Sequence, residues 1–414
     1  MRAIAEGHAT TPTGFNGGSA ACGLKTSGAT DVFLVVSDLE CTAAAVFTRN
    51  RVVAAPVVVD REALAKARSG YRGVIGNAGN ANACTGAQGL ADSEQTRVLA
   101  AQAIGCDARQ LFVLSTGVIG RPLDMDKLAV GIQAAARSLD RAGGAACARA
   151  MMTTDTRPKH LAVEVVLAGG TVSLGGIAKG AGMIHPDMAT MLAVLTTDAV
   201  IDALDLQRML DSAVAGSFNS ISIDGDTSTN DTVLLLANGA SGVAVREDSD
   251  VALFAEGLDC LCLHLAQAIV RDGEGARRFV TVRVTGAPDG AAAHAIANVI
   301  ATSPLVKTAF AGGDPNWGRI LAAAGRAGVA FDPANVSLVV QAGGPAVQLL
   351  AQGMRADYVK RRLRRYSTRM NLRCSLQLAR VRALRVYLRA TLPKSTCASM
   401  QTTQLSNAVN TWMD

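Results

Sequence analysis

The chain has 414 residues, of which 49% are hydrophobic, 4% aromatic and 18% charged. This length and composition favour two or three globular domains with a large core and exclude a mainly disordered protein. The net charge is +6, but residues 355–394 alone carry +12, so the rest of the chain is mildly acidic. Nothing in that acidic body indicates binding to nucleic acid.

Runs of apolar residues between polar or glycine breaks predict β-strands. In chain order the predicted strands are 31–37, 44–48, 56–59, 73–76, 110–114, 161–167, 172–177 and 280–284. Apolar residues at helical spacing predict helices at 92–104, 124–139, 202–215, 250–270 and 291–301. Asp92 and Asp124 are the predicted N-caps of the first two helices. This alternation is compatible with either an α/β or an α+β fold.

Several classes of protein are excluded by missing patterns. The N-terminal sequence lacks the apolar centre of a secretory signal, and no run of 18 apolar residues predicts a membrane span. The nine cysteines form no CxxC pair, which favours reduced thiols and a cytoplasmic protein. Zinc-protease, nucleophile-elbow, dinucleotide and P-loop motifs are absent, so we expect neither a metal nor a bound cofactor.

The segment 175–199, GGIAKGAGMIHPDMATMLAVLTTDA, holds the densest set of candidate functional residues. A threonine hydroxyl that follows a small residue can attack the preceding carbonyl, here that of Ala189, in an N→O acyl shift. Hydrolysis of the ester would leave Thr190 at a new N-terminus, where its α-amine, with an ordinary pKa of about 7.7–8.0, can act as the base. His185 is then not needed as a base. Taken alone, Thr190 could equally be a strand threonine without chemistry.

This segment resembles the self-cleavage site of the ornithine acetyltransferase (glutamate N-acetyltransferase) family, in which KGAGM precedes ATM at the same spacing. Seven further blocks are similar to that family and occur in the same order. They are FTRNRVVAAP (47–56), NAGNANACTG (77–86), STGVIG (115–120), MTTDT (152–156), DGDTSTNDT (224–232), DGEGA (272–276) and LVKTAFAGGDPNWGRI (305–320). Eight blocks in sequence, within about residues 14–340, are too many for a chance similarity.

The resemblance implies an α+β, two-lobed fold of self-processing N-terminal-threonine acyltransferases. The lobes would be residues 1–190 and 191–345, and residues 346–414 would form an aberrant tail. Cleavage would give chains 1–189 and 190–414, which remain together as a heterotetramer of two α and two β chains. The implied reaction is ping-pong transfer of acetyl from N-acetylornithine to glutamate through Thr190, without a cofactor. Whether acetyl-CoA is also a donor is left open.

The resemblance also assigns roles to individual residues. Thr116 and Gly117 would form an oxyanion hole, and Thr153, Lys179, Thr190 and Glu274 would contact the substrate. A lysine suits the α-carboxylate of N-acetylornithine and a glutamate suits its side-chain ammonium. The blocks at 224–232 and 314–319 receive no chemical role.

The C-terminal region departs from the family pattern. Family members end with an asparagine and a terminal Ser or Thr that reach the substrate, and Asn410 and Thr411 are the only candidates for this pair. The Arg-rich sequence at 355–394 is interpreted in part as the product of a shifted reading frame. Three alternative functions remain at this stage. One is an amidohydrolase or aminopeptidase that uses the same threonine with water as acceptor, and the second is an inactive family member with a damaged C-terminus. The third is nucleic-acid binding through the Arg-rich segment, which the acidic body disfavours most.

Overall fold

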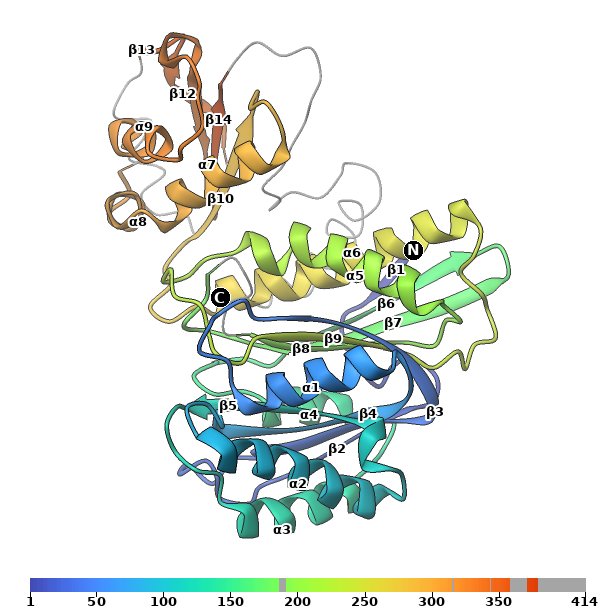
Figure 1. The fold of residues 1–414 in the computed structure, drawn as a ribbon. Coiled ribbons are helices and arrows are strands. Elements are labelled where there is room, and N and C mark those ends of the chain that lie inside the picture. The colour runs from blue at the N-terminus through green and yellow to red at the C-terminus, as the bar shows by residue number, and fades with distance from the viewer. Residues whose placement is uncertain (186–190, 315, 343, 358–370, 379–414) are drawn as a thin grey trace. The chain divides into compact units, whose positions relative to one another are not determined.

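The computed structural model describes residues 1–185, 191–314, 316–342, 344–357 and 371–378. Within these residues the chain forms two compact units. The first contains residues 1–219 and 226–274, and the second contains residues 220–225 and the described part of 275–392. Both units combine sheets with helices, which confirms the α+β class (Figure 1). The expected chain boundary at 189/190 lies within the first unit, between two strands that pair with each other.

The first unit is built on a nine-stranded mixed sheet. Its strand order is β1-β6-β7-β8-β9-β3-β4-β5, and β2 pairs with β3. The pairs β8–β9 and β4–β5 are parallel and the other pairs are antiparallel. The strands are β1 (Arg2–Ile4), β2 (Phe15–Ala20), β3 (Val32–Phe47), β4 (Ser69–Asn80), β5 (Leu111–Val118), β6 (Lys159–Leu167), β7 (Gly170–Lys179), β8 (Leu192–Thr197) and β9 (Thr232–Ala237).

Strand β3 joins two layers of this sheet. Its first half pairs with β2 and β4, whereas residues 42–47 pair with β9. Three exposed residues, 38–40, separate the two halves. The sequence predicted two strands here, at 31–37 and 44–48, and they are the two ends of one 16-residue strand. A strand shared in this way lets the sheet fold back over itself as two stacked layers (Figure 1).

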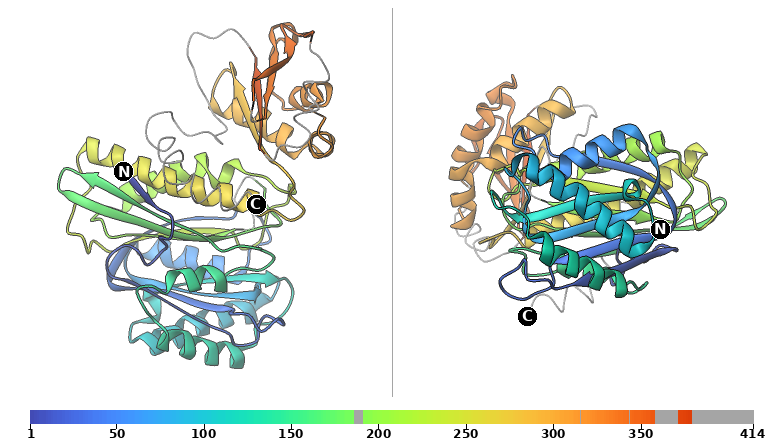
Figure 2. Two further views of the ribbon diagram at one scale, coloured as in Figure 1. Left: turned by 180° about the vertical axis from the view of Figure 1, so that it is seen from behind. Right: turned by 60° about the horizontal axis from the view of Figure 1, so that its bottom comes forward.

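Helices cover the outer faces of both layers. On one side α5 (Ala203–Gly216) and α6 (Asp248–Arg271) pack on β3, β6 and β7, and on the other α2 (Gly86–Ile104) and α3 (Met125–Arg137) pack on β2 to β5 (Figures 1 and 2). Helix α1 (Ala55–Lys66) packs on β3 and β5, and α4 (Gly144–Ala150) contacts strands of both layers. Short 3-10 turns occur at η1 (Ala108–Gln110), η2 (Phe218–Ser220) and η3 (Pro333–Asn335).

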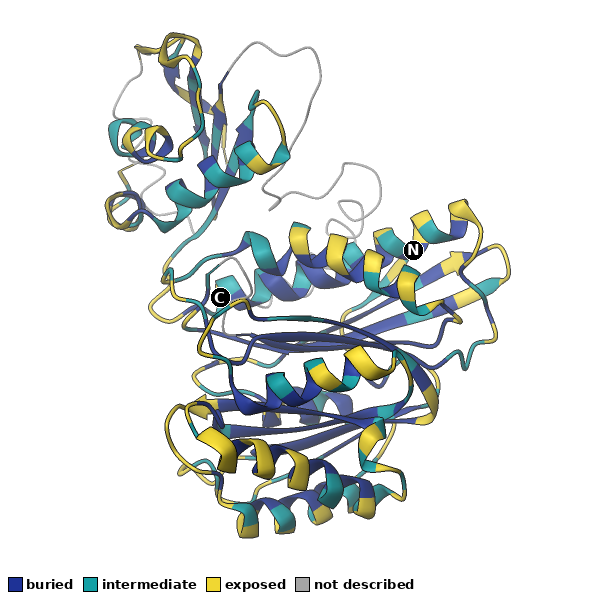
Figure 3. Cartoon of the chain, viewed as in Figure 1, coloured by how far each residue is buried: buried dark blue, intermediate teal, exposed yellow. Residues whose placement is uncertain are grey.

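Side chains on the two faces of β3 enter two different cores. Phe33 and Val35 belong to the core between the layers, whereas Val32 and Leu34 belong to the core under α2 and α3. Successive side chains of a strand point to opposite faces, so a strand covered on both faces is apolar throughout. Figure 3 shows the result, with buried strands between helices whose outer faces are exposed.

Two local predictions are wrong, and one of the two predicted N-caps is confirmed. The predicted strand at 56–59 is the first part of helix α1, which has a proline in its first turn. Proline fits that turn because the N–H it lacks has no partner inside the helix. Asp92 is not an N-cap, because α2 begins six residues earlier, at Gly86. Asp124 does cap α3 by accepting from the N–H of Lys127, and Asp202 caps α5.

The second unit has its own five-stranded sheet and its own core. The strand order is β10-β14-β11-β12-β13, and β14 is parallel to β10 and antiparallel to β11. These strands are β10 (Phe279–Thr285), β11 (Ser337–Gln341), β12 (Val347–Ala351), β13 (Met354–Arg355) and β14 (Asn371–Gln377), and the helices are α7 (Gly290–Thr302), α8 (Pro304–Ala311) and α9 (Trp317–Gly325).

Strand β14 comes from the Arg-rich region that the sequence assigned to an aberrant tail. Its alternate residues Leu372, Cys374 and Leu376 are buried in the core of the second unit. The register of β14 against β10 extends over seven residues without a break. This part of the Arg-rich region therefore has the alternation of a core strand and takes its place inside the sheet.

Helix α6 is the one described helix that is long and apolar enough to cross a membrane by length and composition. Half of its most apolar window is buried inside the fold. It packs on β6 and β7 and against α5. These contacts are those of an apolar core helix in a folded unit.

Candidate active site

The predicted oxyanion motif lies at the end of strand β5. Thr116 is buried, and Gly117 has a φ of +137°, which L side chains rarely adopt. Gly117 lies opposite Gly79 of β4, and a Cβ at position 117 would come within 2.2 Å of the Gly79 carbonyl carbon. A glycine is therefore needed at position 117 for the two strand ends to approach this closely.

Two consecutive residues before β9 connect this strand end to the predicted nucleophile segment. The Asn230 amide donates to the Ser115 carbonyl at 2.9 Å and to the Ala81 carbonyl at 2.6 Å. The Asp231 carboxylate accepts from the Met191 N–H at 2.9 Å. Ser115 O belongs to the peptide bond that precedes Thr116, and Met191 N to the one that follows Thr190. The pair Asn230–Asp231 thus holds the backbone beside both predicted catalytic positions.

Ala189 and Thr190 themselves lie outside the described residues. The described chain resumes at Met191, which is buried, and continues into β8. Lys179, the last residue of β7, is opposite Leu192 of β8, and Leu192 is opposite Thr232 of β9. The ends of these three strands therefore lie side by side just after Met191, where the described chain resumes.

Lys179 is a buried cation among carboxylates. Its side chain is only 2% exposed. Burial lowers the pKa of its ammonium, and the negative charges of Asp155, Asp231 and Glu274 act in the opposite direction. Lys179 was expected to contact substrate, and the structure adds three acidic neighbours that compensate its charge in the protein interior.

Thr153 is positioned by a buried ionic network. Asp155 accepts from the Thr153 N–H at 3.0 Å and from the Gly180 N–H at 2.6 Å. Lys159 Nζ lies 2.6 Å from both Asp155 Oδ1 and Asp272 Oδ2. The network therefore ties the segment with Thr153 to the end of β7 and to the loop after α6.

Glu274 belongs to the loop after α6 and lies against the glycine-rich turn that follows β7. Its N–H donates to the Ala181 carbonyl at 2.7 Å. A Cβ at Gly182 would come within 2.5 Å of Glu274 Oε1, so the absence of a side chain at position 182 makes room for the carboxylate. The negative charges of Glu274 and Asp155 both act on the Lys179 ammonium, so these three side chains lie near one another.

The two buried carboxyls beside Lys179 have opposite pKa shifts. Burial alone would raise the pKa of Asp155, but the charges of Lys179 and Lys159 and the hydrogen bonds it accepts leave that pKa lowered. For Asp231, burial dominates over the Met191 N–H, the Lys179 charge and the nearby Ser228, and its pKa is raised well above the ordinary range. Asp231 therefore holds a proton far more readily than Asp155 does.

Sequence reasoning did not identify Asn230, Asp231, Asp155, Lys159 or Asp272 as parts of the site. Four of these residues lie in blocks that already stood out by their resemblance to the family, MTTDT, DGDTSTNDT and DGEGA. The signal that could have found them is the presence of polar residues at strand ends within those blocks. Among the residues that the structure describes, no group of three or more His, Cys, Asp or Glu side chains could hold a metal ion.

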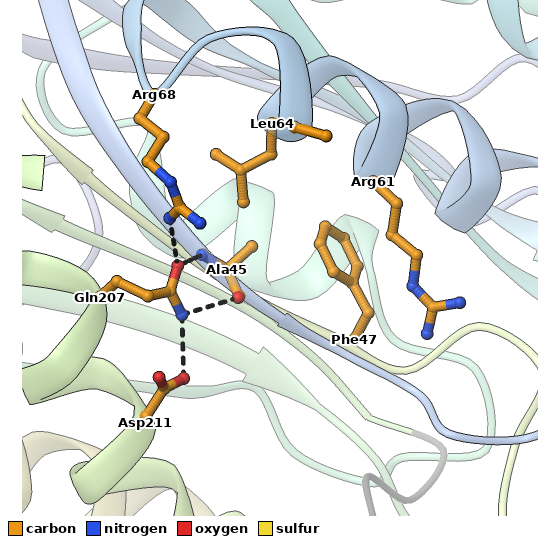
Figure 4. Close-up of a pocket in the computed structure, with 8 residues that line it drawn as sticks. Ala45, Phe47, Arg61, Leu64, Arg68, Gln207 and Asp211 are labelled. Carbon is orange, nitrogen blue, oxygen red and sulfur yellow. Dashed lines mark hydrogen bonds between the residues drawn. The ribbon is translucent and has the colours of Figure 1, made fainter. Parts of the chain in front are cut away.

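A separate pocket of about 370 Å³ contains none of the predicted site residues (Figure 4). Gln207 accepts from Arg68 at 3.0 Å and donates to Asp211 at 2.9 Å. The lining residues are Ala45, Phe47, Arg61, Leu64, Ala65, Arg68, Gln207 and Asp211. Arg68, Gln207 and Asp211 pair with one another, and none of the lining residues is a predicted site residue.

Comparisons with known proteins assign the chain to a family. The ArgJ family model matches residues 16–391 of the chain. The arginine biosynthesis bifunctional protein ArgJ of Symbiobacterium thermophilum is 48% identical over 337 residues, which cover 80% of this chain and 83% of that protein. The protein of the same name from a Synechococcus species is 49% identical over 335 residues, covering 80% of each chain.

A solved structure is also similar. The ornithine acetyltransferase of Mycobacterium tuberculosis, crystallised with ornithine, is 39% identical, with a TM-score of 0.42, and the match covers 45% of this chain and 97% of that chain. The sequence matches define an acyltransferase of amino-acid biosynthesis. The chain belongs to the ArgJ family, and its function is acetyl transfer in arginine biosynthesis.

Proposed function

We propose that the chain cuts itself between Ala189 and Thr190 and that Thr190 then carries the acetyl group from N-acetylornithine to glutamate. The observation that supports this proposal best is the Asn230–Asp231 pair. It holds the peptide bond before Thr116 and the peptide bond after Thr190 in one hydrogen-bonded arrangement. A nucleophile and an oxyanion donor must be held together in this way for acyl transfer.

In this proposal the mature Thr190 is its own base. The freed α-amine takes the hydroxyl proton while the oxygen attacks the acetyl carbon of N-acetylornithine. The Thr116 hydroxyl and the Gly117 N–H stabilise the oxyanion that forms, and ornithine leaves. Glutamate then attacks the acetyl-Thr190 ester and regenerates the enzyme.

Substrate recognition uses opposite charges from the end of β7 and from the loop after α6. Lys179 binds the α-carboxylate of the substrate, Glu274 binds the ammonium at the other end, and Thr153 supplies a polar contact. The close packing of Glu274 on Gly182 and its electrostatic coupling to Lys179 support this division of roles. Loss of the buried neighbours of Lys179 would leave its charge uncompensated, so the acidic residues serve binding as well as stability.

The assembly and location of the protein are part of the same proposal. Chains 1–189 and 190–414 remain together, as two α and two β chains, in the cytoplasm. The pairing of β7 with β8, one on either side of the proposed cut, supports continued association after cleavage. No bound cofactor takes part, and acetyl-CoA is a second donor to be tried in the assay.

The first test is the intact mass of the purified wild-type chain beside Thr190→Ala. We expect the wild type to yield fragments of 189 and 225 residues and Thr190→Ala to remain at 414. Thr190→Ser, which keeps the hydroxyl, is the matched control and should still be cut. An uncut wild-type chain, or a cut Thr190→Ala chain, contradicts the proposal.

The second test separates acetyl transfer from hydrolysis. N-acetylornithine is supplied with and without glutamate, and ornithine, acetate and N-acetylglutamate are measured. Ornithine release that depends on glutamate and yields N-acetylglutamate is the expected result. Acetate release that is independent of glutamate would instead identify an amidohydrolase that uses the same threonine.

A further inference from the structure

The donor and the acceptor of the proposed reaction differ in charge at one end. If the chain transfers acetyl as proposed above, on which this inference rests, N-acetylornithine and glutamate use one site in turn. Both carry an α-carboxylate, but the side chain of the first ends in an ammonium and that of the second in a carboxylate. Glu274 suits the ammonium and repels the carboxylate, so a site that also accepts glutamate needs a cation in addition to Lys179.

Lys25 is a half-buried cation that lies against two parts of the candidate site. Its ammonium donates to the Ala150 carbonyl at 2.9 Å, and Ala150 precedes Thr153 by three residues. Three residues of chain span at most about 11 Å, so the ammonium is near the segment of Thr153. The backbone of Lys25 lies against β4, because a Cβ at Gly79, the residue opposite Gly117, would be 3.2 Å from Lys25 N.

The charge of Lys25 has no ion-pair partner within the described residues. Its ammonium donates to two carbonyl oxygens, those of Thr30 at 2.6 Å and Ala150 at 2.9 Å. A lysine ammonium has three N–H donors, so one of them has no acceptor in the described part of the chain. A partly buried cation without a carboxylate beside it costs free energy, and its presence here requires an explanation.

The loop that carries Lys25, residues 21–31, is held in place by other groups. The Asp31 carboxylate accepts three backbone N–H groups of this loop at 2.7, 2.8 and 3.0 Å. The Asp31 carbonyl accepts from the Ala78 N–H of β4 at 2.8 Å. The loop is therefore fixed beside the strand end without the ammonium of Lys25, which is left for another task.

The charges around Lys25 fit a binding site for a carboxylate. Burial lowers the pKa of its ammonium, the carboxylates of Asp31 and Asp155 act in the opposite direction, and the Lys179 ammonium lowers the pKa further. Among the described residues, Glu274 acts on Lys179 but is not one of the charges that act on Lys25. A carboxylate at Lys25 relieves the repulsion between the two cations and avoids Glu274.

We propose that Lys25 binds the side-chain carboxylate of glutamate while Lys179 binds its α-carboxylate. The third N–H of the Lys25 ammonium is the donor to that carboxylate. N-acetylornithine has no such group and turns its ammonium to Glu274 instead. Lys25 thus selects the acceptor and takes no part in making or breaking bonds.

The test compares two acceptors of the same acetyl group. N-acetylornithine is supplied with either glutamate or isotopically labelled ornithine, and N-acetylglutamate or labelled N-acetylornithine is measured. In Lys25→Met we expect kcat/KM for glutamate to fall by ~10- to 100-fold, the usual effect of losing a hydrogen bond to a charged group, mainly through a higher KM. Exchange with ornithine, which has no side-chain carboxylate, should keep its wild-type rate.

Lys127→Met is the matched control. The Lys127 side chain approaches Gly23 of the same loop, but it is exposed and paired with Asp124 at 2.8 Å, so both reactions should be unchanged. Lys25→Arg keeps the charge and should keep the preference for glutamate. An equal fall with both acceptors in Lys25→Met, or no fall with glutamate, overturns the role of Lys25.

If Lys25→Met does not fold, Lys25→Gln takes its place, because its amide still donates to a carbonyl and carries no charge. The same selective loss of glutamate use is expected. A wild-type chain that transfers acetyl to neither glutamate nor ornithine overturns the proposed function itself. Wild-type transfer to both acceptors, with the same selectivity in Lys25→Gln, overturns only the role of Lys25.

Discussion

Asp155 and Asp231 are both buried carboxyls beside Lys179, yet their environments are opposite. Asp155 accepts from two backbone N–H groups and from Lys159, and its pKa is lowered. Asp231 accepts a backbone N–H with one oxygen, its second oxygen has no partner among the described residues, and its pKa is raised. At Asp155 the effect of burial is outweighed by the charges of Lys179 and Lys159, whereas at Asp231 burial outweighs the Met191 N–H, the Lys179 charge and the hydrogen bonds of Ser228.

The comparison separates two uses of a buried acid. A carboxylate that is fully paired is held in one charge state and fixes the segments that donate to it. A carboxyl that is only partly paired can gain and lose a proton at lower cost, which suits acid–base chemistry. We therefore expect damage to the Asp155 network to appear first in stability.

The largest effect on stability should come from Lys159→Met. This change leaves Asp155 and Asp272, whose side chains are 0% and 7% exposed, without their shared cation. Breaking a buried ion pair typically costs about 3–5 kcal/mol, and urea unfolding measures the loss. Lys127→Met is the control, because its ion pair with Asp124 is exposed and should matter little. If Lys159→Met and Lys127→Met lose equally little stability, the buried network of Asp155 does not stabilise the fold more than an exposed ion pair does.

The next effect should be on turnover, from Gly117→Ala. The added methyl group would meet Gly79 backbone at 2.2 Å and would be strained at a φ of +137°. If the strand end moves and one oxyanion donor is lost, kcat should fall by about 10²–10³. Gly105→Ala has a φ of +75° with open space around it and is the matched control for strain alone. A kcat that falls equally in both variants would count against an oxyanion role for Gly117.

The smallest effect is the pH dependence of stability, which should have opposite signs for the two acids. Asp155 has a folded-state pKa below its ordinary 3.8, so the stability it contributes is present above pH 3.8 and is lost as pH falls through the folded pKa. Asp231 has a folded-state pKa well above 3.8, so stability falls as pH rises from 3.8 through that value.

Chemical denaturation of the wild type, Asp155→Asn and Asp231→Asn across this pH range checks both signs. The stability advantage of the wild type over Asp155→Asn should grow as pH rises toward 3.8. Its advantage over Asp231→Asn should shrink as pH rises above 3.8. Parallel curves for the two variants would mean that the two carboxyls do not differ in protonation.

The sequence by itself determined the features that depend on neighbouring residues. Asp124 could be recognised as a helix cap because a cap bonds to an N–H two or three residues away. The alternating apolar residues likewise predicted the strands β6 and β7. The eight ordered blocks of residues identified the family. The position of Thr190 in its glycine-rich segment belongs to the same local kind of information.

Tertiary structure decided which distant residues meet. Asp231 and Met191 are 40 residues apart, Asn230 and Ser115 are 115 apart, and Thr156 and Asp272 are 116 apart. The valines of helix α1 favour a strand, yet they are helical in the fold. Pro56 lies in the first turn of the helix, and the apolar side chains of the helix are buried. The partners of a buried carboxyl are supplied by the packing of separate strands, and therefore its pKa and its role become visible only when those strands are in place.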